Sequence, residues 1–379
     1  MGGDQLNKKG ILAVGNFDSN EGYAWRLMER FWCDLSQYGM SKNYQTYICF
    51  PTVSVIPQCL KDANCLVDAV DFTSSSFEAV RRQLQYIKKN AIRVLYLTDF
   101  TTYSWRYLLF RLAGVKTIIV HDHTPGVRSL PGRSKAMMKR FLNRAPLISC
   151  SAGLAVSPYV AERLVSVNGL PEEKVFCVTN GIDLTEDDGR EVRAGKGGSL
   201  VRIVTVGRVC HYKGIDFAIE VMNVLVSKYS LSGFEYLIIG DGPDRAEFAE
   251  KVKQLGLEGK VRFVGNVDNV SERLLDCDIA FHPSRGEAMS LAILEYMRAS
   301  LPVVASDNPS VSSALKHREY AMIYPAEDIE RAASTIKHLV ENSAMREQLG
   351  RTAHRKVVEN FSSEVMLSKF RDTISTIVD

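Results

Sequence analysis

Short apolar runs alternate along the chain with longer stretches in which apolar residues recur every three or four positions. The short runs are rich in Val, Ile, Leu and Phe, as in strands that are buried on both faces of a parallel sheet. This order of elements predicts an α/β fold. In the first half, the predicted strands are residues 11–15, 45–50, 93–99, 116–122, 147–152 and 175–180. The predicted helices there are residues 23–38, 77–89, 103–113, 134–143 and 157–167.

The pattern restarts after residues 184–200, which are rich in Gly and charge and show no hydrophobic period. We interpret this segment as a linker or mobile loop. A chain of 379 residues is also too long for one ordinary core. We therefore expect domains at 1–183 and 201–360, and a last helix at 361–379 that can pack back on the first domain. The predicted strands of the second domain are residues 201–207, 235–242, 261–265, 278–284, 302–307 and 321–325, with helices at 214–228 and 244–255.

Composition narrows the class of protein. Apolar residues make up 46% of the chain and charged residues 24%, as in globular proteins that are soluble in water. The net charge of +3 is too small to indicate a nucleic-acid binder. The eight cysteines include no CxxC pair, which favours reduced thiols over disulfides. Apolar runs stay well short of the ~18 residues that span a bilayer, so we expect a cytoplasmic protein.

The stretch VGRVCHYKGIDFAIEV, residues 206–221, combines a strand end, a basic loop and a helix. The strand ends at Gly207, and the loop carries Arg208 and Lys213. Such a loop can aim two cations and a helix N-terminus at one anion, which suits a diphosphate. The alternative is that both cations are solvated surface charges.

The stretch IIGDGPDRAEF, residues 238–248, places Gly240 and Gly242 at another strand-to-helix turn. Arg245 stands where the full dinucleotide fingerprint would have a third glycine. A donor-binding turn is one interpretation. The other is a tight turn that needs positive φ, with Asp241 or Asp244 capping the helix.

The stretch HPSRGEAMSLAILEYM contains two glutamates eight positions apart, Glu287 and Glu295. If the helix begins near Ser290, the N–H groups of Met289, Ser290 and Leu291 form an anion pocket. Glu287 would then accept hydrogen bonds from ligand hydroxyls, and Glu295 would bind an adjacent pair of ribose hydroxyls. The alternative is a helix-start acid favoured by the helix dipole, together with one exposed glutamate.

The stretch IIVHDHTPG ends a predicted strand with His121, Asp122 and His123. A histidine at such a strand end can bind a sugar hydroxyl or transfer a proton. Two His and one Asp are too few for a metal site, and the chain has no HExxH motif. We predict no metal site.

Residues 128–144, RSLPGRSKAMMKRFLNR, carry six Lys and Arg residues and no acid. Met137, Met138, Phe141 and Leu142 lie between these charges. The pattern is typical of an amphipathic surface helix that contacts anionic lipid or a phosphorylated acceptor. A solvated helix with a packed apolar stripe is an equally open alternative.

Taken together, these motifs resemble the retaining glycosyltransferases of family 4. That resemblance implies the GT-B fold, in which two Rossmann-like domains face each other across a deep cleft. The matching segments come in the family's order: GNFDSNEGYAWRL, VHDHTP, VTNGID, GRVCHYKGID, GDGP, and the E-x7-E segment with its two glutamates.

The resemblance also implies roles for individual residues. Arg208 and Lys213 should neutralise the donor diphosphate, and Glu287 should hold sugar hydroxyls. His121 or His123 should contact the transferring sugar, and His121 is the better match. The implied catalytic residues are His121, Arg208, Lys213 and Glu287. The implied donor-side residues are Gly22, His123, Gly207, Gly240, Gly242, Met289, Ser290, Leu291 and Glu295.

The function that the resemblance implies is retaining transfer of a hexose from a nucleotide-diphosphate sugar to a glycan or lipid-linked acceptor. It implies front-face substitution without an enzymic nucleophile, a metal ion or another cofactor. We expect a role in surface polysaccharide or glycolipid assembly, at the inner face of the cell membrane if the basic helix contacts lipid. The alternatives are a nucleotide-sugar epimerase or phosphorylase of similar fold, and a non-catalytic nucleotide-sugar-binding protein.

Overall fold

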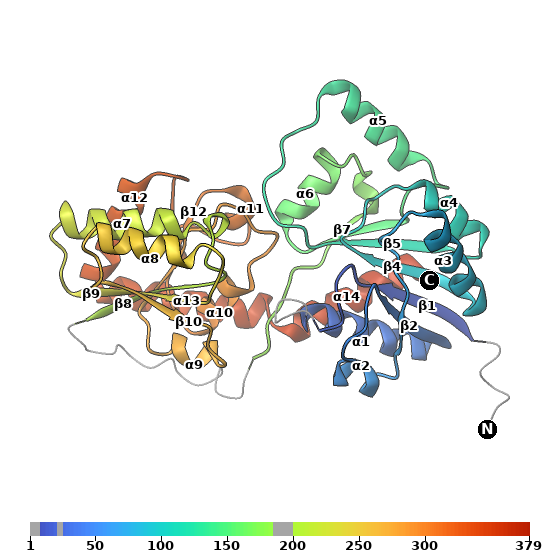
Figure 1. Cartoon of the computed structure of the whole chain (residues 1–379), viewed down its shortest axis with the longest axis horizontal. Coiled ribbons are helices and arrows are strands. Elements are labelled where there is room, and N and C mark those ends of the chain that lie inside the picture. The colour runs from blue at the N-terminus through green and yellow to red at the C-terminus, as the bar shows by residue number, and fades with distance from the viewer. Residues whose placement is uncertain (1–7, 21–25, 185–199) are drawn as a thin grey trace. The chain divides into compact units, whose positions relative to one another are not determined.

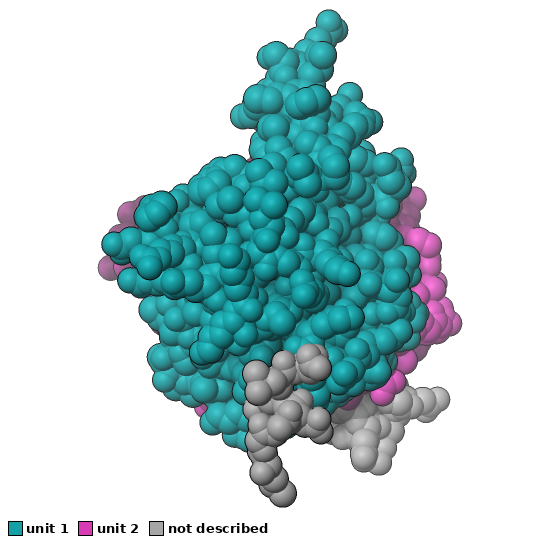
Figure 2. Space-filling view, turned by 90° about the vertical axis from the view of Figure 1, so that its right-hand side faces the viewer, with its two compact units in different colours: residues 1–124, 128–179, 366–379 teal, residues 125–127, 180–365 magenta. Residues whose placement is uncertain are grey.

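The computed structural model describes residues 8–20, 26–184 and 200–379. By its internal contacts the chain forms two compact units, coloured separately in Figure 2. Unit 1 comprises residues 1–124, 128–179 and 366–379, and unit 2 comprises residues 125–127 and 180–365. Among the described helices, we find none that is both long and apolar enough to span a lipid bilayer.

Unit 1 is built on a parallel sheet with the strand order β3-β2-β1-β4-β5-β6-β7 (Figure 1). The strands are β1 Lys9–Val14, β2 Tyr44–Phe50, β3 Leu66–Ala69, β4 Ile92–Thr98, β5 Thr117–Asp122, β6 Ala152–Ala155 and β7 Val175–Cys177. The helices are α1 Arg26–Ser41, α2 Gln58–Asp62, α3 Phe77–Lys89, α4 Trp105–Leu112, α5 Arg133–Arg144, α6 Pro158–Ser166 and most of α14 Ser363–Val378. The strand order reverses between β1 and β4, so the loops after these strands lie at a topological switch point.

Unit 2 has a second parallel sheet, with the strand order β10-β9-β8-β11-β12-β13. The strands are β8 Val201–Val206, β9 Phe234–Ile239, β10 Val261–Gly265, β11 Ile279–His282, β12 Val303–Ser306 and β13 Ala321–Tyr324. The helices are α7 Ile215–Ser227, α8 Arg245–Gln254, α9 Val270–Leu274, α10 Leu291–Arg298, α11 Pro309–Ser312, α12 Ile329–Glu341 and α13 Ser343–Asn360. Successive side chains of β8 point to opposite faces of the sheet and belong to two different hydrophobic clusters. Ile203 belongs to the cluster of Phe217 and Phe281, and Val204 belongs to the cluster of Leu294 and Tyr296.

The predicted α/β class with parallel sheets is confirmed, and most strands begin within two residues of the predicted positions. The strand predicted at 147–152 is wrong, because β6 runs from Ala152 to Ala155. Pairing decides this position, since Ala152 lies opposite Ile119 of β5, whereas Ser149 makes only an isolated bridge to Tyr103. Strand β3 was not predicted, because this short edge strand has no buried residue to mark it.

The contacts place the division between the units after Thr179, whereas the sequence suggested a first domain ending at residue 183. Residues 185–199 of the predicted linker lie outside the described residues. The last helix, α14, packs its residues from Met366 onwards on unit 1. There Arg371 Nη1 lies 2.6 Å from Asp34 Oδ1 on α1, which is 4% exposed.

An aromatic cluster joins α14 to α1 and to the sheet of unit 1. Phe370 is fully buried, and its ring centroid lies 4.9 Å from that of Phe31 and 6.0 Å from that of Tyr96. Phe31 in turn meets the imidazole of His121 edge-on at 4.9 Å. The C-terminal helix therefore forms part of the core beneath the end of β5.

We predict that Phe370→Ala destabilises unit 1 by about 3–5 kcal/mol, because it opens a cavity among these rings. Denaturant unfolding followed by tryptophan fluorescence measures the change. Phe77→Ala is the matched control, since that side chain is 86% exposed and should change stability by less than about 0.5 kcal/mol. Equal stability of the two variants would show that α14 adds little to this core.

Candidate active site

The candidate site of unit 2 lies where the strand order of its sheet reverses. From β8 the chain proceeds through β9 to β10, and from β11 it proceeds through β12 to β13 on the other side. Open parallel sheets bind ligands at the carboxyl ends of the strands beside such a reversal. The loop with Arg208 and Lys213 follows β8, and the loop with Glu287 follows β11. The fold therefore brings the two motifs together.

Glu287 is the centre of this site. Its Oε1 lies 2.7 Å from Lys213 Nζ and 3.1 Å from His282 Nε2. Its backbone N–H donates to Ser310 Oγ at 3.2 Å. The side chain is only 8% exposed, so this carboxylate is buried, and its charge is compensated by Lys213 and His282 from two separate segments. The sequence pointed to Lys213 and Glu287 but not to His282.

The electrostatics of the site keep Glu287 ionised. Burial by itself raises the pKa of this carboxyl, but the hydrogen bond with His282 and the charge of Lys213 outweigh burial. The pKa of Glu287 is lowered to about 2. At neutral pH the group is a carboxylate that accepts hydrogen bonds from hydroxyl donors.

Arg285 joins the two loops that carry Lys213 and Glu287. Its guanidinium forms a two-pronged ion pair with Asp216, with Nη1–Oδ1 at 2.7 Å and Nη2–Oδ2 at 3.0 Å. Its Nε lies 2.9 Å from Glu327 Oε1, and its backbone N–H donates to the carbonyl of Tyr212. The hydrogen bond with Asp216 raises the pKa of Arg285 above its ordinary value. A planar guanidinium that makes two parallel hydrogen bonds holds a carboxylate in one orientation. Arg285 therefore fixes the two loops relative to each other, a role that the sequence did not predict.

Helix α10 begins where the sequence suggested, with Ser290 as its N-cap and Leu291 as its first residue. The Ser290 side chain makes no capping hydrogen bond, and the first N–H groups of a helix have no partner within it. Glu295 is only 6% exposed, so the alternative of an exposed helix glutamate is wrong. Next to it, Tyr296 Oη accepts the N–H of Val206 at 2.6 Å and joins α10 to the end of β8.

The glycines of the two neighbouring loops have a packing role. Gly240 has φ +127°, and a Cβ there would lie 2.1 Å from the carbonyl oxygen of Gly207. A Cβ on Gly242 would lie 2.2 Å from the carbonyl oxygen of Val209. These contacts explain the glycines without a ligand, as the tight-turn interpretation requires. Asp244 is the N-cap of α8 but makes no capping bond with its side chain.

In unit 1, the two histidines at the end of β5 differ in exposure. His121 is fully buried, and its Nδ1 is hydrogen-bonded to the Tyr96 hydroxyl. His123 is partly exposed, and its backbone N–H donates to Asp99 Oδ1 at 2.6 Å. Burial lowers both pKa values, well below the ordinary range for His121 and to about 4 for His123. Both imidazoles are therefore neutral at pH 7, and the Nε2 atoms have no hydrogen-bond partner among the described residues.

Two carboxylates support this part of unit 1. Asp122 Oδ1 pairs with Arg163 Nη2 at 2.9 Å, and Arg163 is 3% exposed. Burial raises the pKa of Asp99 to about 6. Asp99 was not predicted, although a polar residue directly after the buried run LYLT at the switch point was an available signal. Gly22 lies outside the described residues.

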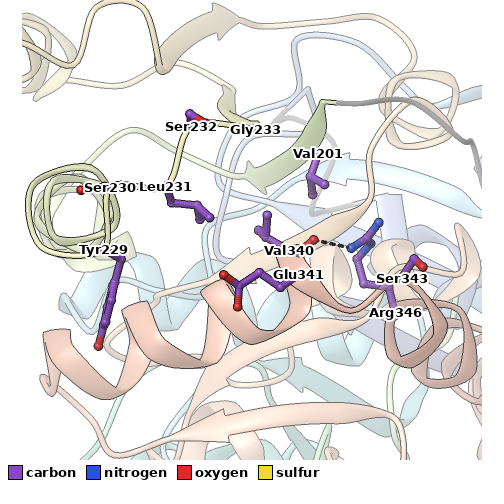
Figure 3. A pocket seen from close by; sticks show the side chains of 10 residues that line it. All are labelled: Val201, Tyr229, Ser230, Leu231, Ser232, Gly233, Val340, Glu341, Ser343 and Arg346. Atoms are coloured by element: carbon purple, nitrogen blue, oxygen red, sulfur yellow. Dashed lines mark hydrogen bonds between the residues drawn. The ribbon is translucent and has the colours of Figure 1, made fainter.

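Arg208 is exposed on its loop, and Met289 is partly buried. Within the described residues, no group of three or more His, Cys, Asp or Glu side chains is arranged to hold a metal ion. A separate cavity of about 470 Å³ in unit 2 is lined by Val201, Tyr229, Glu341 and Arg346, among others (Figure 3). Val201 begins β8, so this cavity lies at the opposite end of the strand from Gly207.

Two family models match the chain. Glycosyltransferase Family 4 matches residues 28–186, and Glycosyl transferases group 1 matches residues 193–356. Together they cover every strand from β2 to β13 and the switch-point loops of unit 2. The chain therefore belongs to glycosyltransferase family 4, with the GT-B fold.

Individual relatives agree with this membership. An uncharacterized glycosyltransferase of Haemophilus influenzae is 26% identical over 170 residues, 45% of this chain and 47% of that protein. The amylovoran biosynthesis glycosyltransferase AmsK of Erwinia amylovora is 26% identical over 232 residues, 59% of this chain and 56% of that protein. The chain thus spans about half the length of these relatives. The structure of Anabaena HepE in complex with UDP and glucose has a TM-score of 0.70 at 15% identity, covering 97% of this chain and 100% of that chain.

We predict that Glu287 contributes an acid-sensitive part of the stability of unit 2. Its folded pKa of about 2 lies below the ordinary value of 4.5. Its contribution is therefore fully present above about pH 4.5 and is lost as the pH falls from there towards 2. Glu287→Gln should remove on the order of 3 kcal/mol at pH 7 and should flatten the pH dependence in that window.

The measurement is denaturant unfolding across that pH range, followed by circular dichroism. Glu327→Gln is the control. The Glu327 side chain is 60% exposed, and Arg285 still has its ion pair with Asp216 when Glu327 is replaced. An unchanged pH slope in Glu287→Gln would mean that the buried ion pair does not lower the pKa as described.

Proposed function

We propose that this chain is a retaining glycosyltransferase that moves a hexose from a nucleotide-diphosphate sugar to an acceptor hydroxyl. The observation that carries the proposal is the ion pair of the partly buried Lys213 with the buried Glu287 at the switch point, beside the start of α10. It places a fixed cation and a fixed carboxylate within 2.7 Å of each other. A donor with an anionic diphosphate next to a hydroxyl-bearing sugar matches that combination of charges.

In this proposal different residues bind the diphosphate, the sugar and the ribose of the donor. Lys213 and Arg208 neutralise the diphosphate, whose negative charge grows as the sugar leaves. The ionised Glu287 accepts hydrogen bonds from sugar hydroxyls, and Glu295 holds the ribose. The N–H groups of Met289, Ser290 and Leu291 contact phosphate oxygens, as at other helix starts.

The proposed chemistry needs no enzymic nucleophile, metal ion or other cofactor. The bond between the anomeric carbon and the phosphate oxygen breaks while a bond to the acceptor oxygen forms on the same face. The acceptor proton passes to the leaving phosphate. Glu287 is already engaged by Lys213 and His282, which supports binding rather than nucleophilic attack. A product with inverted anomeric configuration would overturn the retaining part of the proposal.

Arg285 is the proposed positioning residue of this site, because it locks the Glu287 loop to the first turn of α7. We predict that Arg285→Lys raises the donor KM by about tenfold with a smaller effect on kcat, since a lysine cannot form the fork with Asp216. Steady-state kinetics with varied donor measures the split.

Glu327→Gln is the control for this prediction, because it removes the more exposed arm and leaves the Asp216 fork intact. Its KM should change by less than about twofold. Equal effects of the two substitutions would contradict the special role of the fork.

The acceptor class is proposed from the name of a relative and from the histidines of unit 1. We propose a glycan or lipid-linked acceptor in surface polysaccharide or glycolipid assembly, at the cytoplasmic face of the membrane. The name of AmsK, an amylovoran biosynthesis glycosyltransferase, supports a polysaccharide. The resemblance assigns contact with the transferring sugar to His121 or His123. The Nε2 atoms of both residues are buried without a partner among the described residues, and His123 is the less buried residue of the two, which favours it as the direct contact.

The test begins with the donor. We predict that one of UDP, GDP or ADP raises the melting temperature by a few degrees at about 100 times its Kd, which corresponds to ~2.7 kcal/mol. UDP is the first choice, because the HepE structure contains it. Arg208→Ala and Glu295→Ala should each lose most of the shift. Arg262→Ala should keep it, because this exposed arginine lies on the edge strand β10.

Absence of a shift with every nucleotide would overturn the donor site. A full shift without sugar transfer to any acceptor would instead favour a non-catalytic binding protein. Conversion of the bound sugar to its epimer without an acceptor would indicate an epimerase.

A further inference from the structure

Helix α5 of unit 1 exposes most of its surface, including its large apolar side chains. Of its residues Arg133–Arg144, only Asn143 is buried. Met137 is 71% exposed, Met138 is 52% exposed and Phe141 is 75% exposed. The helix stands out from the sheet of unit 1 in Figure 1, and it forms the projection at the top of Figure 2. The alternative of a packed apolar stripe is therefore wrong for this helix.

One side of α5 is fastened to the loop that follows α6. Lys139 Nζ donates to the carbonyl of Val167 at 2.8 Å, and Asn143 Nδ2 donates to the carbonyl of Asn168 at 2.9 Å. Successive helix residues turn by about 100°. Met137 and Phe141 therefore lie on the side opposite Lys139, pointing away from the attachment.

The charged residues on the outward side of α5 are all positive. At the same rotation per residue, Arg133, Arg140 and Arg144 lie along one flank of the Met137–Phe141 face. None of these three arginines pairs with a carboxylate among the described residues. The sequence from residue 123 to residue 161 contains no Asp or Glu. The surface therefore combines exposed apolar groups with uncompensated positive charge.

We propose that this outward face of α5 is a docking surface for a bilayer that contains anionic lipid. Met137 and Phe141 enter the boundary between headgroups and acyl chains, while the flanking arginines contact lipid phosphates. A helix with this combination lies in the plane of the interface, and both contributions add to its binding. Contiguous exposed apolar groups are uncommon on monomers that stay in water. The proposal does not depend on the proposed function, because docking needs no donor.

The test uses the full chain and vesicles of phosphatidylcholine with or without phosphatidylglycerol, separated by sedimentation. The expected result is binding to the anionic vesicles only, weakened by added salt. Replacing Arg133, Arg140 and Arg144 with Gln should weaken binding by roughly tenfold to a hundredfold. The pair Met137→Ser and Phe141→Ser should weaken it by roughly tenfold or more.

The matched control removes three exposed cations from α3 of the same unit, with Arg81→Gln, Arg82→Gln and Lys88→Gln. This variant should keep at least about half of the binding, because α3 is not the proposed surface. Circular dichroism and melting temperature confirm that every variant is folded.

Equal loss in the α3 variant, or full binding in both α5 variants, would overturn the proposal. So would equal binding to uncharged vesicles, or no vesicle binding at all. A second copy of the chain could cover the same face instead, and light scattering tests this by measuring the oligomeric state. A change from dimer to monomer in the α5 variants, without vesicle binding by the parent protein, would assign the face to self-association.

Discussion

The buried carboxylate of Glu287 is the constraint around which unit 2 is arranged. A carboxylate that is almost removed from water is strongly disfavoured unless charges and hydrogen bonds replace its hydration. Lys213, from the loop after β8, and His282, at the end of β11, provide that replacement for the carboxylate. The Ser310 hydroxyl, from α11 after β12, accepts the backbone N–H of Glu287 and holds its loop in place. The loops that follow these three strands must therefore lie close together around Glu287.

Further contacts hold the same loops in place. The Arg285 fork ties the Glu287 loop to α7, and Tyr296 ties α10 to the end of β8. The close approach of Gly240 to Gly207 leaves no room for a side chain between the β8 and β9 loops. A site fixed by so many contacts is prearranged, which lowers the entropy lost when a ligand is ordered there.

The sequence indicated where the loops with Lys213 and Glu287 lie and where α10 begins, because these signals are local. Strand ends, glycine turns and the start of α10 are set by neighbouring residues, so Lys213, Glu287 and Glu295 could be named in advance. His282 and Arg285 lie within the quoted motif, yet the spacing of His282 from Glu287 does not show that the two side chains meet, and Arg285 pairs with Asp216, 69 positions away. No local pattern indicates such pairings. The same holds for His121, whose burial depends on Tyr96 and on Phe31 from distant elements.

By itself, the sequence determined the alternation of strands and helices, the two-sheet organisation and the loops that carry charge, because hydrophobic period and turn chemistry act over a few residues. Only the tertiary structure decided the start of β6, the return of α14 to unit 1 and the exposure of the apolar face of α5. Those features depend on which distant surfaces meet. A stripe of Met and Phe has the same pattern whether it is covered or not, and only the packing around it shows that this one is open.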